Sequence, residues 1–318
     1  MTAVLWGSGF SARKMALVYV SPMMLNTIRF LVGAVLVAIF YILYRMKTVG
    51  SLDPRVIPPD EADDTEADGS ALKPRTIRHQ ILGGFLMGTA LAGAAGIQQF
   101  ALAMIAAGKV SFYTSLYSIF VPIISAIFLR TRIGKNVWIG AVLATAGIYL
   151  ISGGVIRNLG LGDILGLTCG IGFAIQILFI DKYTRDSDGI FLSVCEMVFA
   201  GLWSLILTLI TGSVNTFALI MKAFWPLVYT SVFAFAIPYT LQVIGQKHAA
   251  PSVSAIIFSL ESVFGLLFAM LILGDRMSLM QLAGCAVIFV GVIMAQLKRK
   301  PREGHLADKD TKNSRSNA

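Results

Sequence analysis

The chain has 318 residues, of which 56% are apolar and only 14% are charged. An ordinary soluble domain carries roughly 25% charged residues, so this composition excludes a typical water-soluble protein. The formal net charge of +9 does not indicate a nucleic-acid partner, because Lys and Arg are scattered between apolar stretches instead of forming one basic face. We therefore predict an all-α, multi-pass integral membrane protein whose partner is the lipid bilayer, with no nucleic acid.

Ten stretches of the chain suit a membrane, since a transmembrane helix needs about 20 mostly apolar residues. In chain order the predicted spans are 2–19, 23–44, 80–104, 107–129, 136–154, 161–180, 189–211, 223–246, 251–273 and 278–297. Between them, the cytoplasmic loop 45–79 is predicted to be solvated and mostly disordered, as is the basic cytoplasmic tail 298–318. The three cysteines and three histidines are isolated from one another, which predicts neither a metal site nor a cofactor.

The basic residues predict the orientation in the membrane. An even number of spans places both termini on one side, and the cytoplasmic side carries the excess of Lys and Arg. The side of the termini has 19 basic residues and the other side has 6, among them Arg13, Lys14 and Lys109. We therefore predict that both termini are cytoplasmic.

An internal repeat relates the two halves of the chain. A shift of 144 residues lays the third to fifth spans over the eighth to tenth without a gap across more than 50 residues. Chance similarity between two Ala-, Leu- and Gly-rich helices is the plainer interpretation, but one register holds through the loops. Matched polar residues and glycines include Gln98 with Gln242, Ser115 with Ser259, Ser118 with Ser262, Gly140 with Gly284 and Gly147 with Gly291. The first two spans align less closely, with Gly7–Phe10 over Gly170–Phe173 and Arg29 near Glu196.

The repeat predicts inverted topology, because a unit with an odd number of spans must enter the membrane from the opposite side the second time. We predict a first five-helix repeat at residues 1–154 and a second at 155–297. In secondary transporters such inverted repeats give two conformations, one open to each side, with the substrate near the midplane. The repeat therefore favours a small-molecule transporter that works by alternating access.

Three ionisable residues stand out inside the predicted spans, namely Arg29, Glu196 and Glu261. Such residues are expensive in lipid and are retained mostly where they face a cavity or a partner. Glu261 is predicted near the midplane, at the depth that Tyr117 occupies in the other repeat. A low-dielectric cavity favours the protonated form of a carboxyl group, so Glu261 or Glu196 is a candidate for proton coupling. The alternative is that each glutamate only bonds to neighbouring helices.

Aromatic and polar side chains are predicted to line the same cavity. Tyr113 and Tyr117 are four residues apart and so share a helix face, and unpaired amides should point away from lipid. For each amide, hydrogen bonding between helices is the alternative to substrate contact. The predicted substrate pathway comprises Trp6, Ser8, Arg29, Gln98, Tyr113, Tyr117, Gln176, Tyr239, Gln242 and Glu261.

Several motifs resemble the EamA-type family of the drug/metabolite transporter superfamily. They are Leu5–Phe10 followed by Lys14, Arg29-Phe30 in the second span, the start of the fourth span, and Ser259–Phe264 in the ninth. The resemblance implies ten helices with an inverted repeat and export of metabolites, often amino acids, across the bacterial inner membrane. Two features depart from the family pattern. Ser262 stands where proline is common, so a proline-linked irregularity is not expected there, and Met1 lies almost at the start of the first span.

Other functions are less consistent with the residues. The chain has no phosphate-binding Gly-x-x-x-x-Gly-Lys-Ser/Thr motif, so transport would draw on ion gradients. An intramembrane enzyme needs a catalytic dyad at one depth, and none is present in the predicted spans, so we predict that the protein is not an enzyme. A flippase for lipids or lipid-linked substrates and a non-transporting membrane sensor remain alternatives, and the chain is expected to be a monomer or a homodimer.

Overall fold

The computed structural model describes residues 1–50, 77–151, 160–185, 187–273 and 278–297. The predicted tail 298–318 and most of the predicted loop 45–79 lie outside these residues. The loop boundaries were wrong on both sides, because α2 (Pro22–Gly50) continues past residue 45 and α3 (Ile77–Met104) begins before residue 80.

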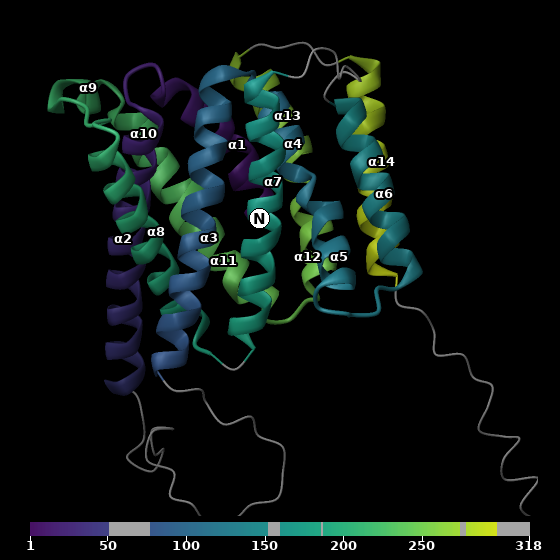
Figure 1. Ribbon diagram of the computed structural model, residues 1–318, viewed down its shortest axis with the longest axis horizontal. Helices are drawn as coiled ribbons and strands as arrows, with labels where there is room; N and C mark the ends of the chain where they lie inside the picture. Colours follow the sequence, from purple (N-terminus) through teal and green to yellow (C-terminus); the bar gives the residue numbers. More distant parts are fainter. Residues whose placement is uncertain (51–76, 152–159, 186, 274–277, 298–318) are drawn as a thin grey trace, which may run out of the picture.

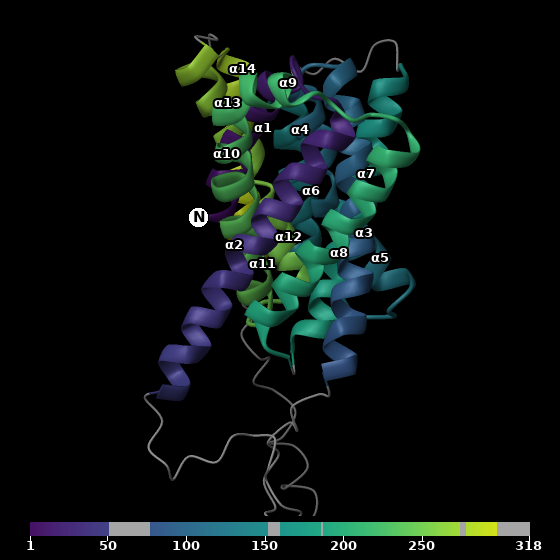
Figure 2. The same ribbon diagram turned by 90° about the vertical axis from the view of Figure 1, so that its left-hand side faces the viewer.

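In the described part of the chain all regular elements are helices, and most run side by side in one bundle (Figure 1). The short α9 lies across one end of it (Figure 2). Besides α2 and α3, the helices of the described residues are α1 (Thr2–Ala16), α4 (Ala107–Ser115), α5 (Tyr117–Ile127), α6 (Lys135–Ile151), α7 (Leu161–Thr184), α8 (Gly189–Ile210), α9 (Phe217–Lys222), α10 (Phe224–Ser231), the π-helical turn η1 (Val232–Ala236), α11 (Ile237–Gln246), α12 (Pro251–Phe258), α13 (Glu261–Leu273) and α14 (Leu279–Gln296).

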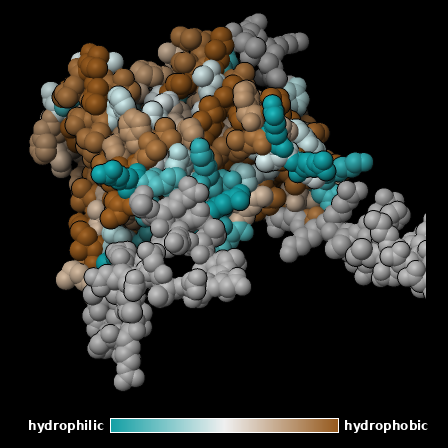
Figure 3. Space-filling model, turned by 60° about the horizontal axis from the view of Figure 1, so that its bottom comes forward, coloured by the Kyte–Doolittle hydropathy of each residue, from teal (hydrophilic) through white to brown (hydrophobic). Residues whose placement is uncertain are grey.

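Seven helical stretches are long and apolar enough to cross a membrane, among the described residues. They are α2, α3, α4–α5, α7, α8, α10–α11 and α12–α13, while α6 and α14 are shorter apolar helices. Hydrophobic residues cover the sides of the bundle and hydrophilic ones gather at the end that faces forward in Figure 3. A lipid layer around the sides would bury this apolar surface, so the chain is an integral membrane protein.

Two of the predicted continuous helices are broken at equivalent positions. The fourth span divides at Leu116 into α4 and α5, and the ninth divides near Leu260 into α12 and α13. At both breaks the backbone turns more tightly, because the N–H of Leu116 bonds to the carbonyl of Tyr113 and that of Leu260 to the carbonyl of Ile257. The break before Glu261 therefore forms although residue 262 is serine and not proline.

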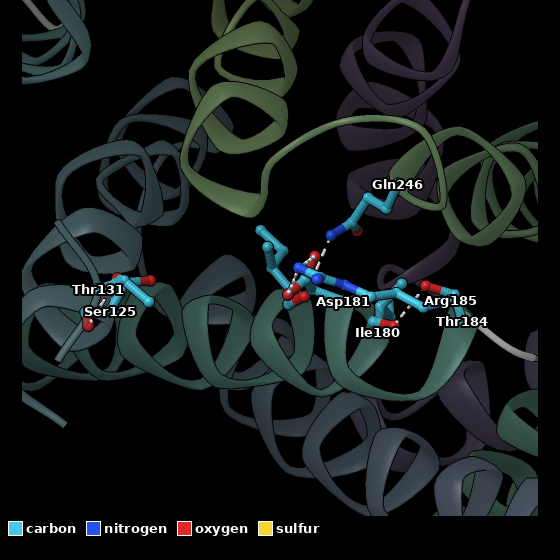
Figure 4. Close-up of polar contacts among 8 residues, drawn as sticks. Ser125, Thr131, Ile180, Asp181, Thr184, Arg185 and Gln246 are labelled. Atoms are coloured by element: carbon cyan, nitrogen blue, oxygen red, sulfur yellow. Dashed lines mark hydrogen bonds and ion pairs between the residues drawn. The ribbon is translucent and has the colours of Figure 1, made fainter. Parts of the chain in front are cut away.

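The eighth predicted span is also irregular. A π-helical turn, Val232–Ala236, separates α10 from α11. Pro238 lies two residues beyond this turn and has no N–H to donate to it, so the wider π-type hydrogen bonding accommodates the proline. Beyond it, the amide of Gln246 donates to the carbonyl of Ile177 over 3.1 Å and ties the end of α11 to α7 (Figure 4).

Helices α6 and α14 lie side by side at one edge of the bundle (Figure 1). A Cβ atom added at Gly140 would lie 2.6 Å from the carbonyl oxygen of Gly291, and one added at Gly147 would lie 2.6 Å from that of Gly284. Only glycine permits such close backbone approach between helices in lipid. The contact therefore depends on all four glycines.

Candidate functional site

A pocket in the centre of the bundle is lined by residues from both halves of the chain. It encloses about 400 Å³ of empty space, including space open to solvent. The pocket brings together eight of the ten residues predicted for the substrate pathway. They are Trp6, Arg29, Gln98, Tyr117, Gln176, Tyr239, Gln242 and Glu261.

Glu261 lies at the pocket wall, on the first residue of α13. Its Oε1 accepts hydrogen bonds from the Ser115 hydroxyl at 3.1 Å and from the Tyr117 hydroxyl at 3.0 Å. The break before α13 places this carboxyl at a helix N-terminus, where free backbone N–H groups and the helix dipole favour negative charge. The two helix breaks thus put Glu261 and Tyr117 at facing helix starts.

Glu196 is connected to the pocket by Gln176, which lines it. Gln176 donates to Oε1 of Glu196 over 2.7 Å, and its amide also bonds to that of Gln242 at 3.3–3.4 Å. Glu196 is fully buried, and its Oε2 has no hydrogen-bond partner among the described residues. Within that part of the chain no ion pair joins Glu196 to Arg29.

Arg13 is a pocket residue that sequence reasoning missed. The orientation count assigns it to the side opposite the termini, but it is buried with 6% exposure. Its Nη1 donates to Oε1 of Gln98 over 2.5 Å, and the guanidinium lies 4.3 Å from the ring centre of Phe10. The spacing of Trp6, Phe10 and Arg13 matches one face of a helix, and this pattern was the available signal.

Ser8 and Tyr113 do not line the central pocket, contrary to expectation. Ser8 accepts a hydrogen bond of 2.7 Å from the Tyr229 hydroxyl. The Tyr113 hydroxyl donates to Asp163 over 3.0 Å, away from Tyr117. The four-residue rule that aligned the two tyrosines holds only within a continuous helix, and the break at Leu116 separates them.

A second pocket adjoins the first, with about 1190 Å³ of empty space that includes open solvent. Phe10 lines both pockets. Lys14 and Lys109 line only the second, where Lys109 pairs with Asp163 at 2.8 Å. Phe10 therefore forms part of the partition between the central pocket and a wider, basic chamber.

Membrane helices that surround a buried polar pocket define a membrane transporter. Comparison with known proteins identifies which kind. The model of the EamA-like transporter family matches residues 1–153 and 160–296, and the chain therefore belongs to this family. The predicted family is confirmed, and both the family and the relatives below are transporters. Among the described residues no group of three or more His, Cys, Asp or Glu side chains is placed to hold a metal ion.

Similar proteins extend over most of the chain. An uncharacterized transporter of Archaeoglobus fulgidus is 27% identical over 301 residues, which are 94% of this chain and 84% of that relative. An uncharacterized transporter of Methanothermobacter thermautotrophicus is 26% identical over 182 residues, or 55% of this chain and 52% of the relative. A solved crystal structure with 16% identity matches with a TM-score of 0.70 and covers 93% of this chain and 94% of its own, which shows a shared fold.

Proposed function

We propose that this protein is a secondary active transporter that exports small polar metabolites, such as amino acids, by alternating access. The observation that carries the proposal is the central pocket, whose polar wall combines side chains from both halves of the chain. At this wall Tyr117 from the first half donates a hydrogen bond to Glu261 from the second. A site shared in this way changes its access whenever the halves move relative to each other.

The proposal includes ten membrane helices in two inverted repeats. Adding α1, α6 and α14 to the seven long apolar stretches completes ten. The separate family matches at residues 1–153 and 160–296 support two units. So does the contact between α6 and α14: Gly140 meets Gly291 while Gly147 meets Gly284. In the 144-residue register Gly140 is equivalent to Gly284 and Gly147 to Gly291, so this reciprocal pattern is what a two-fold axis produces.

A difference between the halves supports alternating access. A Cβ atom added at Gly7 of α1 would lie 2.7 Å from the carbonyl oxygen of Glu261. At the equivalent Gly170 of α7 it would lie 2.6 Å from the carbonyl oxygen of Tyr113, not from that of Tyr117, the equivalent of Glu261. The two contacts thus differ by four residues along the equivalent segments. Exchange of these two arrangements between the halves would convert one open state into the other.

Proton coupling through Glu261 is part of the proposal, with Glu196 as a second proton carrier linked by Gln176. A carboxyl that loses its proton in the pocket needs compensating donors, and the hydroxyls of Ser115 and Tyr117 already face Glu261. A solute whose own donors pair with the ionised carboxylate of Glu261 would be released when that carboxyl takes up a proton. Protonation and solute binding would then alternate at one site, as exchange of protons for solute requires.

We further propose that both termini face the cytoplasm of the cell, in its plasma membrane, and that Lys109 faces the other side. Lys109 lies at the wall of the wider chamber and is 35% exposed. An impermeant amine reagent added to intact cells should modify Lys109 and leave a tag at the C-terminus inaccessible. Modification of both from the same side would contradict the inverted topology.

Flux measurements in proteoliposomes test the transport proposal. Vesicles that contain the full-length protein are loaded with a metabolite mixture, and efflux is followed with and without a pH gradient. We expect specific efflux of water-soluble metabolites that accelerates when protons flow in the opposite direction. Movement of labelled lipid without metabolite flux would indicate a flippase, and metabolite binding without either movement would indicate a sensor.

A further inference from the structure

We propose that the central pocket binds a solute through a carboxylate group and that Arg29 is the residue that holds it. This inference rests on the proposed transport function and specifies its substrate class. Arg29 lies on α2, lines the pocket and is 2% exposed. Its Nε and Nη2 have no hydrogen-bond partner among the described residues.

Two buried guanidinium nitrogens without acceptors are costly, because a charge removed from water needs paired hydrogen-bond acceptors. Arg29 has instead the faces of two aromatic rings, with 4.7 Å to the centre of Phe30 and 5.7 Å to that of Phe235. These rings interact with the cation and fix its plane. They do not supply acceptors for the N–H groups at the edge of the guanidinium. The fork of N–H donors suits the two oxygens of a carboxylate.

The carboxyl groups nearest the pocket form no ion pair with Arg29 among the described residues. Glu261 accepts from Ser115 and Tyr117, and Glu196 accepts from Gln176. The ion pairs among the described residues join Lys109 to Asp163 and Arg185 to Asp181, and neither includes Arg29. The protein side chains described here therefore leave this cation for an external anion.

Arg13 differs from Arg29 because a protein partner already binds it. Its Nη1 donates to Gln98, and this bond has a counterpart in the second half, where Gln176 bonds to Gln242. Arg13 and Gln176 are equivalent in the register that lays Gly7–Phe10 over Gly170–Phe173. We therefore assign Arg13 to the linkage between helices and Arg29 to the ligand.

The charge of the pocket wall favours a solute with one negative charge. Two arginines and one glutamate line it, which leaves a single positive charge when Glu261 is ionised. A phosphate ester carries about 1.5 to 2 negative charges at pH 7 and would exceed this balance. The Nε1 of Trp6 is a further donor at the wall without a partner among the described residues. The unpartnered N–H groups of Arg29 and Trp6 need acceptor oxygens, and a carboxylate supplies them.

The test compares acids with their matched neutral amides. Purified full-length protein is heated with a graded series of carboxylic acids and α-amino acids, each beside its primary amide, and with inorganic phosphate. At a fixed ligand concentration, a ligand that binds the native state raises the unfolding temperature by an amount that grows with the logarithm of its affinity. We expect acids to bind at least about tenfold more tightly than their amides, in keeping with charge-assisted bonds to the guanidinium.

Arg29→Gln should remove this preference for acids, and Arg29→Lys should weaken it, because lysine keeps the charge but not the fork. The control is Arg185→Gln, which changes an exposed arginine paired with Asp181 outside the pocket (Figure 4) and should leave the preference unchanged. If Arg29→Gln does not fold, the comparison of acids with amides on the unaltered protein and on Arg29→Lys decides.

Equal binding of acids and amides, an unchanged preference in Arg29→Gln, or binding of phosphate in place of carboxylates would overturn the inference. Its failure is separable from failure of the proposed function. Carboxylate binding that depends on Arg29 without any flux in proteoliposomes would contradict transport alone. Flux of solutes that lack a carboxylate would contradict the assignment of Arg29 alone.

Discussion

The hydroxyl of Tyr117 donates a hydrogen bond to Oε1 of Glu261 over 3.0 Å, although the two residues lie 144 positions apart in the chain. That separation equals the shift of the proposed internal repeat, in which each of the two residues is the equivalent of the other. In a two-fold arrangement, a residue touches its own equivalent only close to the axis. The pair therefore lies where the two halves meet, at the wall of the central pocket.

Glu261→Gln is expected to abolish acceleration of efflux by a pH gradient. Glutamine keeps the size of the side chain and accepts from Tyr117, but it cannot take up or release a proton. Efflux from proteoliposomes is measured over a range of pH values inside and outside. Asp181→Asn, which alters a carboxylate paired with Arg185 outside the pocket, should behave like the unaltered protein. Unchanged pH dependence in Glu261→Gln would rule out coupling through this residue.

Gly7→Ala is expected to slow transport severalfold. The new methyl group would lie 2.6 Å from the backbone nitrogen of Gly265, so α1 can no longer pack closely on α13. Gly93→Ala serves as the control because, among the described residues, its methyl group would meet nothing within 4 Å outside its own helix. Initial rates are compared at equal protein content. Equal rates in Gly7→Ala and the control would show that this contact is not used in the cycle.

Gly147→Ala is expected to lower stability. Its methyl group would lie 2.6 Å from the carbonyl oxygen of Gly284, and overpacking of this kind typically costs about 1–3 kcal/mol. Unfolding in detergent micelles should therefore occur at a lower temperature than in the unaltered protein. Gly93→Ala should instead be neutral or stabilising by about 0.5–1 kcal/mol, because alanine favours the helix. A Gly147→Ala protein as stable as the control would mean that α6 and α14 separate easily.

Phe10→Ala is expected to make the transporter leaky. The ring lines both pockets, so its removal would join the central pocket to the wider chamber. Passive efflux of a small neutral solute should rise, and its dependence on the pH gradient should fall. The control, Phe128→Ala, changes a ring that is 77% exposed on the outside of the bundle. If passive efflux through the Phe10→Ala protein does not rise, other groups separate the central pocket from the wider chamber.

Much of the pocket was predictable from the sequence. Polar residues such as Gln98, Gln242 and Glu261 stand out in apolar spans because lipid does not tolerate them without a partner. Their burial around one pocket follows from that cost. The reciprocal glycines of α6 and α14 were also visible, as matched pairs in one register.

Arg13 and Tyr113 show where this reasoning fails. Arg13 is close to the end of a span, and hydropathy assigns such a charge to water, whereas Gln98 and Phe10 hold it inside. Tyr113 shares a helical spacing with Tyr117, but the chain breaks at Leu116 without proline or glycine to signal it. In both cases contacts between distant segments outweighed the local pattern.

The sequence by itself determined that the chain is a membrane protein of repeated apolar helices and that it resembles one transporter family. These properties depend on the sum of many local preferences for lipid, which one residue cannot reverse. The tertiary structure alone decided where helices break, that Tyr117 meets Glu261, and that Nε and Nη2 of Arg29 have no protein acceptor among the described residues. Such features depend on the distance between a few atoms of separate helices, and that distance is set only when the helices pack together.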